Sequence, residues 1–207
     1  MMMKLEHRVL EQRMANTRLE KRGENGSRIE GYAAVYFNEA DPENTQYRLW
    51  DDYYERIMPG AFDEAIRNDD VRCLFNHDPN QVLGRNKSET LKLSVDGRGL
   101  FYSCDCPETT IGKDVATSIS RGDISGSSFG FIVHEAEYRE IDGIWYRELI
   151  RVGLFDVSPV TFPAYTGTTT DIAQRSLTAR KSELAELRRA KLDREIAFLE
   201  LGATDSE

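Results

Sequence analysis

Three short stretches of the sequence hold side chains that can work together in nucleophilic chemistry. They are "FNHDPN" with His77, "GDISGSSFGF" with Ser127 and Ser128, and "LFDVSPV" with Asp156. A serine hydroxyl is a poor nucleophile near neutral pH and needs a base, for which a neutral imidazole is suited. A carboxylate can orient that imidazole. The residue types therefore predict a candidate site, provided that the fold brings the three stretches together.

His77 is the best candidate for the base among the histidines, which are His7, His77 and His134. It ends the apolar run "VRCLFNH" and is followed by polar residues. The alternative is a hydrogen-bonded turn residue without a chemical role. His134 lies on the same strand-like segment as Ser128, and a rise of about 3.3 Å per residue puts the two about 20 Å apart. A base for Ser128 must therefore come from another strand.

A third group is needed to orient the base, and the sequence leaves its identity open. The candidate carboxylates are Asp78, Asp123, Glu148 and Asp156. Asp156 is the one charged residue in the apolar stretch "VGLFDVSPVTFPA", and a buried carboxylate needs a partner such as an imidazole N–H. The alternative is that Asp156 faces solvent or pairs with Arg121 or Arg151.

Cofactor and metal chemistry have little support in the sequence. Cys104 and Cys106 form a C-x-C pair and Cys73 is distant, whereas zinc sites favour C-x-x-C spacing. Small buried thiols are the better interpretation, and Cys73 lies in an apolar run that disfavours a thiolate nucleophile. The chain has no phosphate-binding loop, dinucleotide fingerprint or H-E-x-x-H motif. We therefore expect neither a cofactor nor a metal.

Composition narrows the class of protein. The chain has 207 residues and a formal net charge of −9, which argues against non-specific nucleic-acid binding. No apolar run approaches the ~20 residues that span a bilayer, and the start lacks the apolar segment of a signal peptide. The odd count of 3 cysteines fits reduced thiols better than a disulfide framework. A cytosolic protein that binds neither membrane nor nucleic acid is the expectation.

The chain divides into three regions by composition. Residues 1–28 are polar with both charge signs and predict a flexible or loosely helical N-terminal arm. Residues 29–172 hold most of the apolar and aromatic content and predict one domain. Residues 175–207 predict an amphipathic helix and tail, with a cap at Ser182 and an end at Gly202. The apolar residues at helical spacing in this region are Leu184, Leu187, Ile196 and Leu199.

The central region predicts an α+β fold that consists mainly of strands. Apolar runs alternate with turn signals, of which Asp96-Gly97 and Asp142-Gly143 are typical of hairpins. The stretch "TTIGKDVATSISRGDI" predicts a helix that ends near Gly122. Many short strands with a few helices indicate a barrel or sandwich with helices on its outside.

Five motifs in a fixed order give the chain a resemblance to a known family. They are "GYAAVY", "ERIMPGAF", "FNHD", "DISGSSFGF" and "LFDVSPVTFPAY". In this order the chain resembles the prohead serine proteases of HK97-type tailed bacteriophages over about residues 29–170. That family is distantly similar to the herpesvirus protease assemblin. The resemblance implies a β-barrel of assemblin type with surrounding helices, to which this chain adds a C-terminal helix.

The resemblance also implies a function and assigns residues to it. The family's histidine falls on His77, its nucleophile on Ser128 rather than Ser127, and its acidic residue on Asp156. The implied activity is a serine endopeptidase that cuts scaffold or capsid-protein extensions, and itself, during prohead maturation. The implied partners are the major capsid protein, the scaffold protein and further copies of the chain, inside the assembling prohead in the host cytoplasm.

Two other functions compete with this one. The first is a non-catalytic capsid-assembly or scaffold protein on the same fold, with His77 and Ser128 unused. The second is a hydrolase of another substrate class, such as a small-molecule esterase. A fluorophosphonate probe separates an enzyme from a scaffold, and a capsid-protein substrate separates a protease from an esterase.

Overall fold

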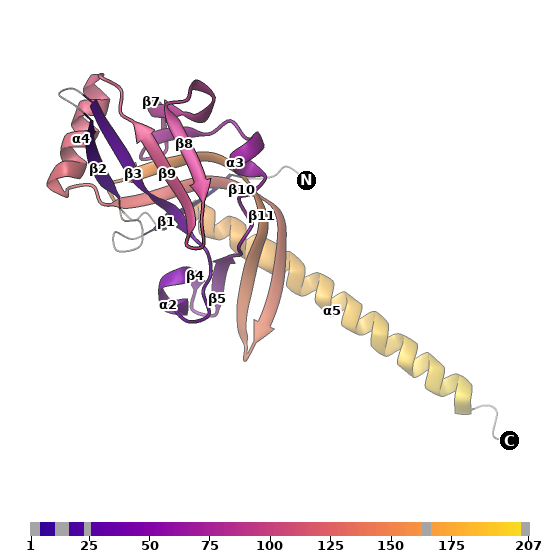
Figure 1. Ribbon diagram of the computed structural model, residues 1–207. Helices are drawn as coiled ribbons and strands as arrows, with labels where there is room; N and C mark the ends of the chain where they lie inside the picture. Colours follow the sequence, from indigo (N-terminus) through magenta and orange to yellow (C-terminus); the bar gives the residue numbers. More distant parts are fainter. Residues whose placement is uncertain (1–4, 11–16, 23–25, 163–166, 204–207) are drawn as a thin grey trace. The chain divides into compact units, whose positions relative to one another are not determined.

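The structure is a computed structural model, which describes residues 5–10, 17–22, 26–162 and 167–203 (Figure 1). It separates into two units, residues 1–170 and 171–207, and each is described by itself. The described part of the first unit consists mainly of strands with short helices, and the second is helical. The predicted α+β class, with strands predominating, is confirmed.

The larger sheet has seven strands and carries the central hairpin of the fold. Its main path runs in the order β1, β10, β11, β5 and β4, and β6 pairs with both β11 and β7. The bounds of these strands are β1 Glu6–Leu10, β4 Gln46–Trp50, β5 Tyr53–Ile57, β6 Arg72–Phe75, β7 Asp78–Arg85, β10 Gly126–Ile141 and β11 Ile144–Val160. Strands β10 and β11 pair antiparallel along nearly their whole length, so they form a long two-stranded ribbon (Figure 1).

The smaller sheet has four strands in the order β2, β3, β9 and β8. Their bounds are β2 Arg18–Arg22, β3 Gly26–Val35, β8 Leu91–Val95 and β9 Gly99–Asp105. The hydrophobic core contains side chains from both sheets and from the helices. Its largest fully buried apolar members are Tyr53, Tyr102, Phe62, Phe129, Phe131, Ile29, Ile57, Leu100 and Leu149.

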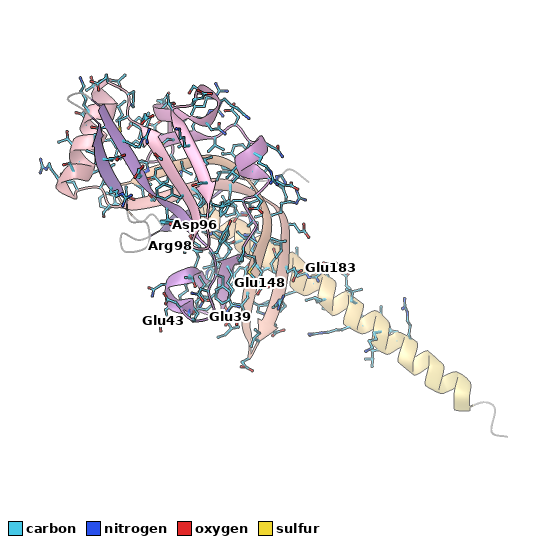
Figure 2. The ribbon with its side chains drawn as sticks, viewed as in Figure 1. Glu39, Glu43, Asp96, Arg98, Glu148 and Glu183 are labelled. Carbon is cyan, nitrogen blue, oxygen red and sulfur yellow. The ribbon has the colours of Figure 1, made fainter. Side chains whose placement is uncertain are left out.

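The predicted hairpin turns are confirmed. At the β10–β11 turn, Asp142 and Gly143 have φ of 52° and 80°, and Ile141 pairs with Ile144. Positive φ at both central residues is what the favoured two-residue hairpin turn requires. At the β8–β9 turn, Asp96 Oδ1 accepts hydrogen bonds from the backbone N–H groups of Arg98 and Gly99 at 2.8 and 3.1 Å. Figure 2 shows Asp96 and Arg98 together at this turn.

Short helical segments connect the strands. They are α2 Pro42–Thr45, α3 Ala65–Asn68, the 3-10 turn Asn86–Ser88 and α4 Thr110–Arg121. Thr109 caps the N-terminus of helix α4, since its side chain accepts a hydrogen bond from the N–H of Gly112, and Gly122, with φ of 84°, caps the C-terminus. A glycine in the left-handed conformation is a common helix end, so the predicted end near Gly122 is confirmed.

The predicted flexible N-terminal arm is wrong for the described residues of 1–28. Glu6–Leu10 is β1, an edge strand paired with β10, and Arg18–Arg22 is β2, paired with β3. Charged residues in this region suggest solvent exposure, yet Glu6 and Arg8 are buried. Their burial is possible because each meets an opposite charge inside the sheet.

The described residues of the second unit belong to one long helix, α5, which spans Gly167–Ala203. The predicted helix is confirmed, but its predicted limits are wrong because α5 continues through Ser182 and Gly202. Residues 185–194 are exposed throughout, including Leu187 and Leu192. Arg180 and Glu183 form an ion pair at 2.8 Å. No helix in the described residues is long and apolar enough to cross a membrane.

Two acidic and two basic side chains form a buried charge cluster that joins β1 to β5 and β11. Arg147 contacts Glu6 and Glu55 at 2.9 Å each. Arg8 contacts Glu6 at 2.8 Å and Glu55 at 2.6 Å. Burial opposes ionisation of Glu6, but the hydrogen bonds and charges of Arg147 and Arg8 together outweigh it and hold its pKa below the usual value. The charges therefore balance inside the sheet.

Removing one member of this cluster should leave an uncompensated buried charge. We expect Arg147→Met to lower the free energy of unfolding by about 3–5 kcal/mol in urea denaturation. Arg48→Met, which removes an exposed arginine of β4 that pairs with the exposed Asp51, is the matched control and should cost about 1 kcal/mol or less. Equal losses for the two variants would contradict the role of the cluster.

Candidate active site

His77 lies on a tight turn that holds its ring beside β10 and β11. Strands β6 and β7 pair through Phe75 and Asp78, so Asn76 and His77 are the two central residues of a hairpin turn. Their φ values are 53° and 59°, a conformation that non-glycine residues rarely adopt. The Asn76 side chain holds the turn in place, because its Oδ1 accepts a hydrogen bond from the Thr161 N–H at 2.9 Å.

The two serines of β10 point in different directions, as alternation along a strand requires. Ser128 Oγ lies 2.6 Å from His77 Nε2. Ser127 Oγ contacts the hydroxyls of Tyr102 at 2.8 Å and Thr17 at 2.9 Å. Ser128 thus meets the imidazole, and Ser127 is a structural polar group.

The surroundings of Ser128 differ from a nucleophile elbow. Gly126, Ser128 and Gly130 have the G-x-S-x-G spacing of that motif. An elbow, however, puts its serine on a strand-to-helix turn, and Ser128 lies within a strand. The spacing alone does not therefore indicate the α/β-hydrolase class.

Asp156 contacts the other side of His77, and the pairing of β10 with β11 puts it there. Asp156 Oδ2 lies 2.6 Å from His77 Nδ1 and accepts a hydrogen bond from Ser158 Oγ at 2.8 Å. Gly130 is opposite Asp156 in the register. A Cβ atom on Gly130 would collide with the Asp156 carboxylate, so glycine is required to make room for it.

The three side chains form a continuous hydrogen-bonded chain. An ionised carboxylate only accepts hydrogen bonds, so His77 Nδ1 carries the proton that faces Asp156. In the neutral ring Nε2 then has a free lone pair directed at Ser128 Oγ. This is the tautomer that a general base needs in order to take the serine proton.

The other carboxylates considered in the sequence have different partners. Asp78 Oδ1 accepts a hydrogen bond from the Asn80 N–H at 2.8 Å. Asp123 forms an ion pair with Arg121 at 3.0 Å. Glu148 forms one with Arg139 at 2.8 Å. None of these contacts involves His77, whereas Asp156 lies 2.6 Å from its Nδ1.

The cysteines are free thiols in the core or at its border. Cys73 and Cys104 are buried and Cys106 is half-buried, so the expectation of small buried thiols is confirmed for the first two. A hydrogen bond with Cys104 and burial raise the pKa of Cys73. Burial raises the pKa of Cys106 to about 12. These shifts disfavour the thiolates and with them a cysteine nucleophile.

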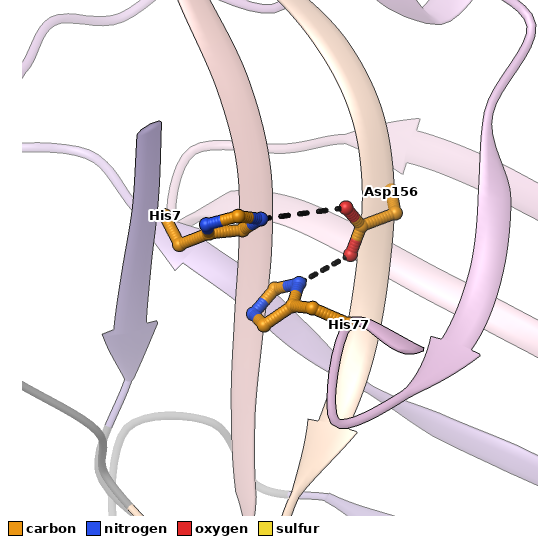
Figure 3. A group of neighbouring side chains, drawn as sticks. All are labelled: His7, His77 and Asp156. Atoms are coloured by element: carbon orange, nitrogen blue, oxygen red, sulfur yellow. Dashed lines mark hydrogen bonds and ion pairs between the residues drawn. The ribbon is translucent and has the colours of Figure 1, made fainter. Parts of the chain in front are cut away.

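His7 and Ser158 lie next to His77 and Asp156, and neither position was predicted from the sequence. The His7 ring lies against the His77 ring with centroids 4.0 Å apart, and its Nε2 is 3.9 Å from Asp156 Oδ1 (Figure 3). Burial, the charge of His77 and that of Arg8 lower the pKa of His7 to about 4, against the attraction of Asp156. The position of Ser158 could have been predicted from the sequence, because it is two residues from Asp156 and therefore on the same face of the strand.

The same group contains the atoms that a metal ion would use. In the described part of the chain, His7, His77 and Asp156 each have a possible ligand atom within 4.8 Å of the others. Two imidazoles and a carboxylate are ligands that zinc accepts. The same His77 ring and Asp156 carboxylate form the 2.6 Å hydrogen bond described above.

Ser127 and Ser128 should differ in their reactivity toward a fluorophosphonate. We expect Ser128→Ala to abolish labelling by a fluorophosphonate over hours, because only Ser128 has a base within reach. Ser127→Ala is the matched control and should be labelled at a rate close to that of the wild type. Intact mass measures both, and loss of labelling in Ser127→Ala alone would contradict the assignment.

His7 should make stability depend on pH. Its pKa is 6.5 in a free chain and about 4 when folded, so the unfolded chain binds a proton that the folded chain does not in this window. Stability should therefore fall as the pH drops from 6.5 to 4, by roughly 2–3 kcal/mol more in the wild type than in His7→Asn. Urea titrations at several pH values measure this, and parallel losses for the two proteins would contradict it.

The chain is similar to a known protein family and to a solved structure. No curated protein sequence matches the chain. The capsid assembly protease of bacteriophage T4, gp21, is a similar solved structure with 14% sequence identity and a TM-score of 0.45, and the match covers 77% of this chain and 99% of that one. The family model of the caudovirus prohead serine protease matches residues 13–183. Since that match spans most of the sequence, the chain belongs to the caudovirus prohead serine protease family.

Proposed function

We propose that this chain is a serine endopeptidase that cuts scaffold or capsid-protein extensions during phage prohead maturation. The observation that carries the proposal is the unbroken contact from Asp156 through His77 to Ser128, with both hydrogen bonds at 2.6 Å. Membership of the prohead protease family supports the substrate class. The place of action is then the assembling prohead in the host cytoplasm.

The geometry supports an acyl-enzyme mechanism. Ser128 Oγ attacks the scissile carbonyl carbon while His77 Nε2 takes the hydroxyl proton. Asp156 keeps His77 oriented and stabilises the imidazolium that forms. His77 then gives its proton to the leaving amine, the C–N bond breaks, and water hydrolyses the ester on Ser128 by the reverse transfer. Ser158 supports the step indirectly by holding the Asp156 carboxylate.

The proposal extends to self-cleavage and to assembly of several copies, as in the family that the motifs indicate. The described N-terminal strands and helix α5 are segments outside the β10–β11 hairpin that trimming would remove or release. Intact mass of the purified chain over a long incubation tests this. A mass that stays at full length under conditions where a capsid protein is cut would argue against self-cleavage.

Co-expression with the capsid and scaffold proteins of the same phage tests the function. The wild type should release capsid or scaffold fragments that intact mass identifies, Ser128→Ala should release none, and Ser127→Ala should behave like the wild type. Cleavage that persists in Ser128→Ala would overturn the assignment of the nucleophile. A well-folded wild type that cuts neither protein would favour the non-catalytic capsid-assembly function.

A further inference from the structure

His7 adds a third potential metal ligand to the pair formed by His77 and Asp156. In the register of the larger sheet, His7 on β1 is opposite Gly130 on β10, and Gly130 is opposite Asp156 on β11. Directly opposed residues of neighbouring strands point to the same face of a sheet. The His7 ring and the Asp156 carboxylate therefore share one face, where the β6–β7 turn also puts the His77 ring (Figure 3).

Both imidazoles direct a ring nitrogen at the carboxylate. His77 Nδ1 lies 2.6 Å from Asp156 Oδ2, and His7 Nε2 lies 3.9 Å from Asp156 Oδ1. The first contact is a hydrogen bond, whereas the second is too long to be one. Two ligand atoms on one tetrahedral zinc ion are about 3.3 Å apart, since each bond to the metal is about 2.0–2.1 Å long. Both separations are therefore within about 1 Å of what a shared ion requires.

Gly130 leaves space between His7 and Asp156 because it has no side chain. A Cβ atom at Gly130 would lie 2.3 Å from Asp156 Oδ1 and 3.1 Å from His7 Nε2. A carbon atom at 2.3 Å from the carboxylate would collide with it. A zinc ion, in contrast, binds carboxylate oxygens at about 2.0–2.2 Å. The space beside Gly130 therefore suits a metal ion and excludes a side chain.

The charge of Asp156 also favours a cation. The carboxylate is buried, and among the described residues its ion-pair partners are His7 and His77, without a lysine or an arginine. Its other hydrogen-bond donor is the neutral hydroxyl of Ser158. Imidazole carries a charge only when it is protonated, so neutral rings leave the buried negative charge unbalanced. A divalent cation would supply the opposite charge that a buried carboxylate needs.

The ligand types favour zinc over magnesium and calcium. Imidazole nitrogen and carboxylate oxygen are common zinc ligands, and three protein ligands leave a fourth position for water. Magnesium and calcium prefer oxygen ligands alone. Spacing in the sequence gives no indication of such a site, because its three residues come from β1, the β6–β7 turn and β11.

We propose that His7, His77 and Asp156 form a zinc site, and that zinc bound there removes His77 as the base for Ser128. The metal takes the lone pair of His77 Nδ1, so the proton of the neutral ring moves to Nε2. Nε2 then has no lone pair with which to accept the proton of Ser128. Zinc is thus a reversible inhibitor. The inhibition rests on the proposed function, whereas the metal site does not.

Zinc titration of the full chain by isothermal calorimetry tests the site. We expect zinc to bind His7→Asn at least tenfold more weakly than the wild type, because one of three ligands is lost. His134→Asn is the matched control, since it removes an exposed histidine of β10 that lies outside the cluster, and it should bind zinc like the wild type. Equal zinc affinities of the wild type and His7→Asn would overturn the site.

A measurement on the wild type makes the test independent of how well a variant folds. In nitrogen NMR of histidine-labelled protein, zinc should shift the ring signals of His7 and His77 and leave those of His134 in place. It should also move the proton of His77 to Nε2, and a chelator should reverse both changes. Shifts at His134 alone, or a His77 proton that stays on Nδ1 in the zinc-loaded chain, would overturn the proposal.

Fluorophosphonate labelling separates the metal site from the proposed function. Zinc should slow the labelling of Ser128 at least tenfold in the wild type and have little effect in His7→Asn. Equal slowing in the two proteins would overturn inhibition through this site. If zinc binds through His7 but the zinc-free chain is neither labelled nor cuts a capsid protein, the proposed function fails and the metal site stands. Cleavage by a chain that binds no zinc would overturn the metal site alone.

Discussion

The register between β10 and β11 is the constraint on which the site depends. It puts Ser128 opposite Ser158 and Gly130 opposite Asp156. The pairing then shifts, because Phe131 is opposite Leu154 and Phe155 is left as the extra residue of a bulge. A slip by one residue would turn Ser128 to the face where Ser127 contacts Tyr102. Hydrogen bonds along the whole hairpin thus fix which serine meets the imidazole.

Strand β1 both stabilises the larger sheet and lies over Ser128. Its two buried charges, on Arg8 and Glu6, form ion pairs with Glu55 and Arg147, so the sheet gains a paired edge and a balanced interior charge. The same strand puts the Arg8 carbonyl at Ser128 and the His7 ring at His77.

Much of the site could be predicted from the sequence, because its signals are local. Asp142-Gly143 predicts a hairpin from turn chemistry alone, and a lone carboxylate in an apolar strand indicates that Asp156 has a buried partner. The N-terminal strands could not be predicted in this way. Glu6 and Arg8 have the composition of a solvated arm, and only pairing with Glu55 and Arg147, remote in sequence, makes their burial favourable. The position of His7 could not be predicted for the same reason, since its neighbours His77 and Asp156 are distant along the chain.

We propose that Asp156 holds His77 in the tautomer that accepts the proton of Ser128. Nitrogen NMR of histidine-labelled protein measures this tautomer, because the sequence has 3 histidines and single substitutions assign them. We expect neutral His77 to carry its proton on Nδ1 in the wild type and in Ser128→Ala, and we expect Asp156→Asn to change this. A neutral His77 protonated on Nε2 in the wild type would overturn this role of Asp156.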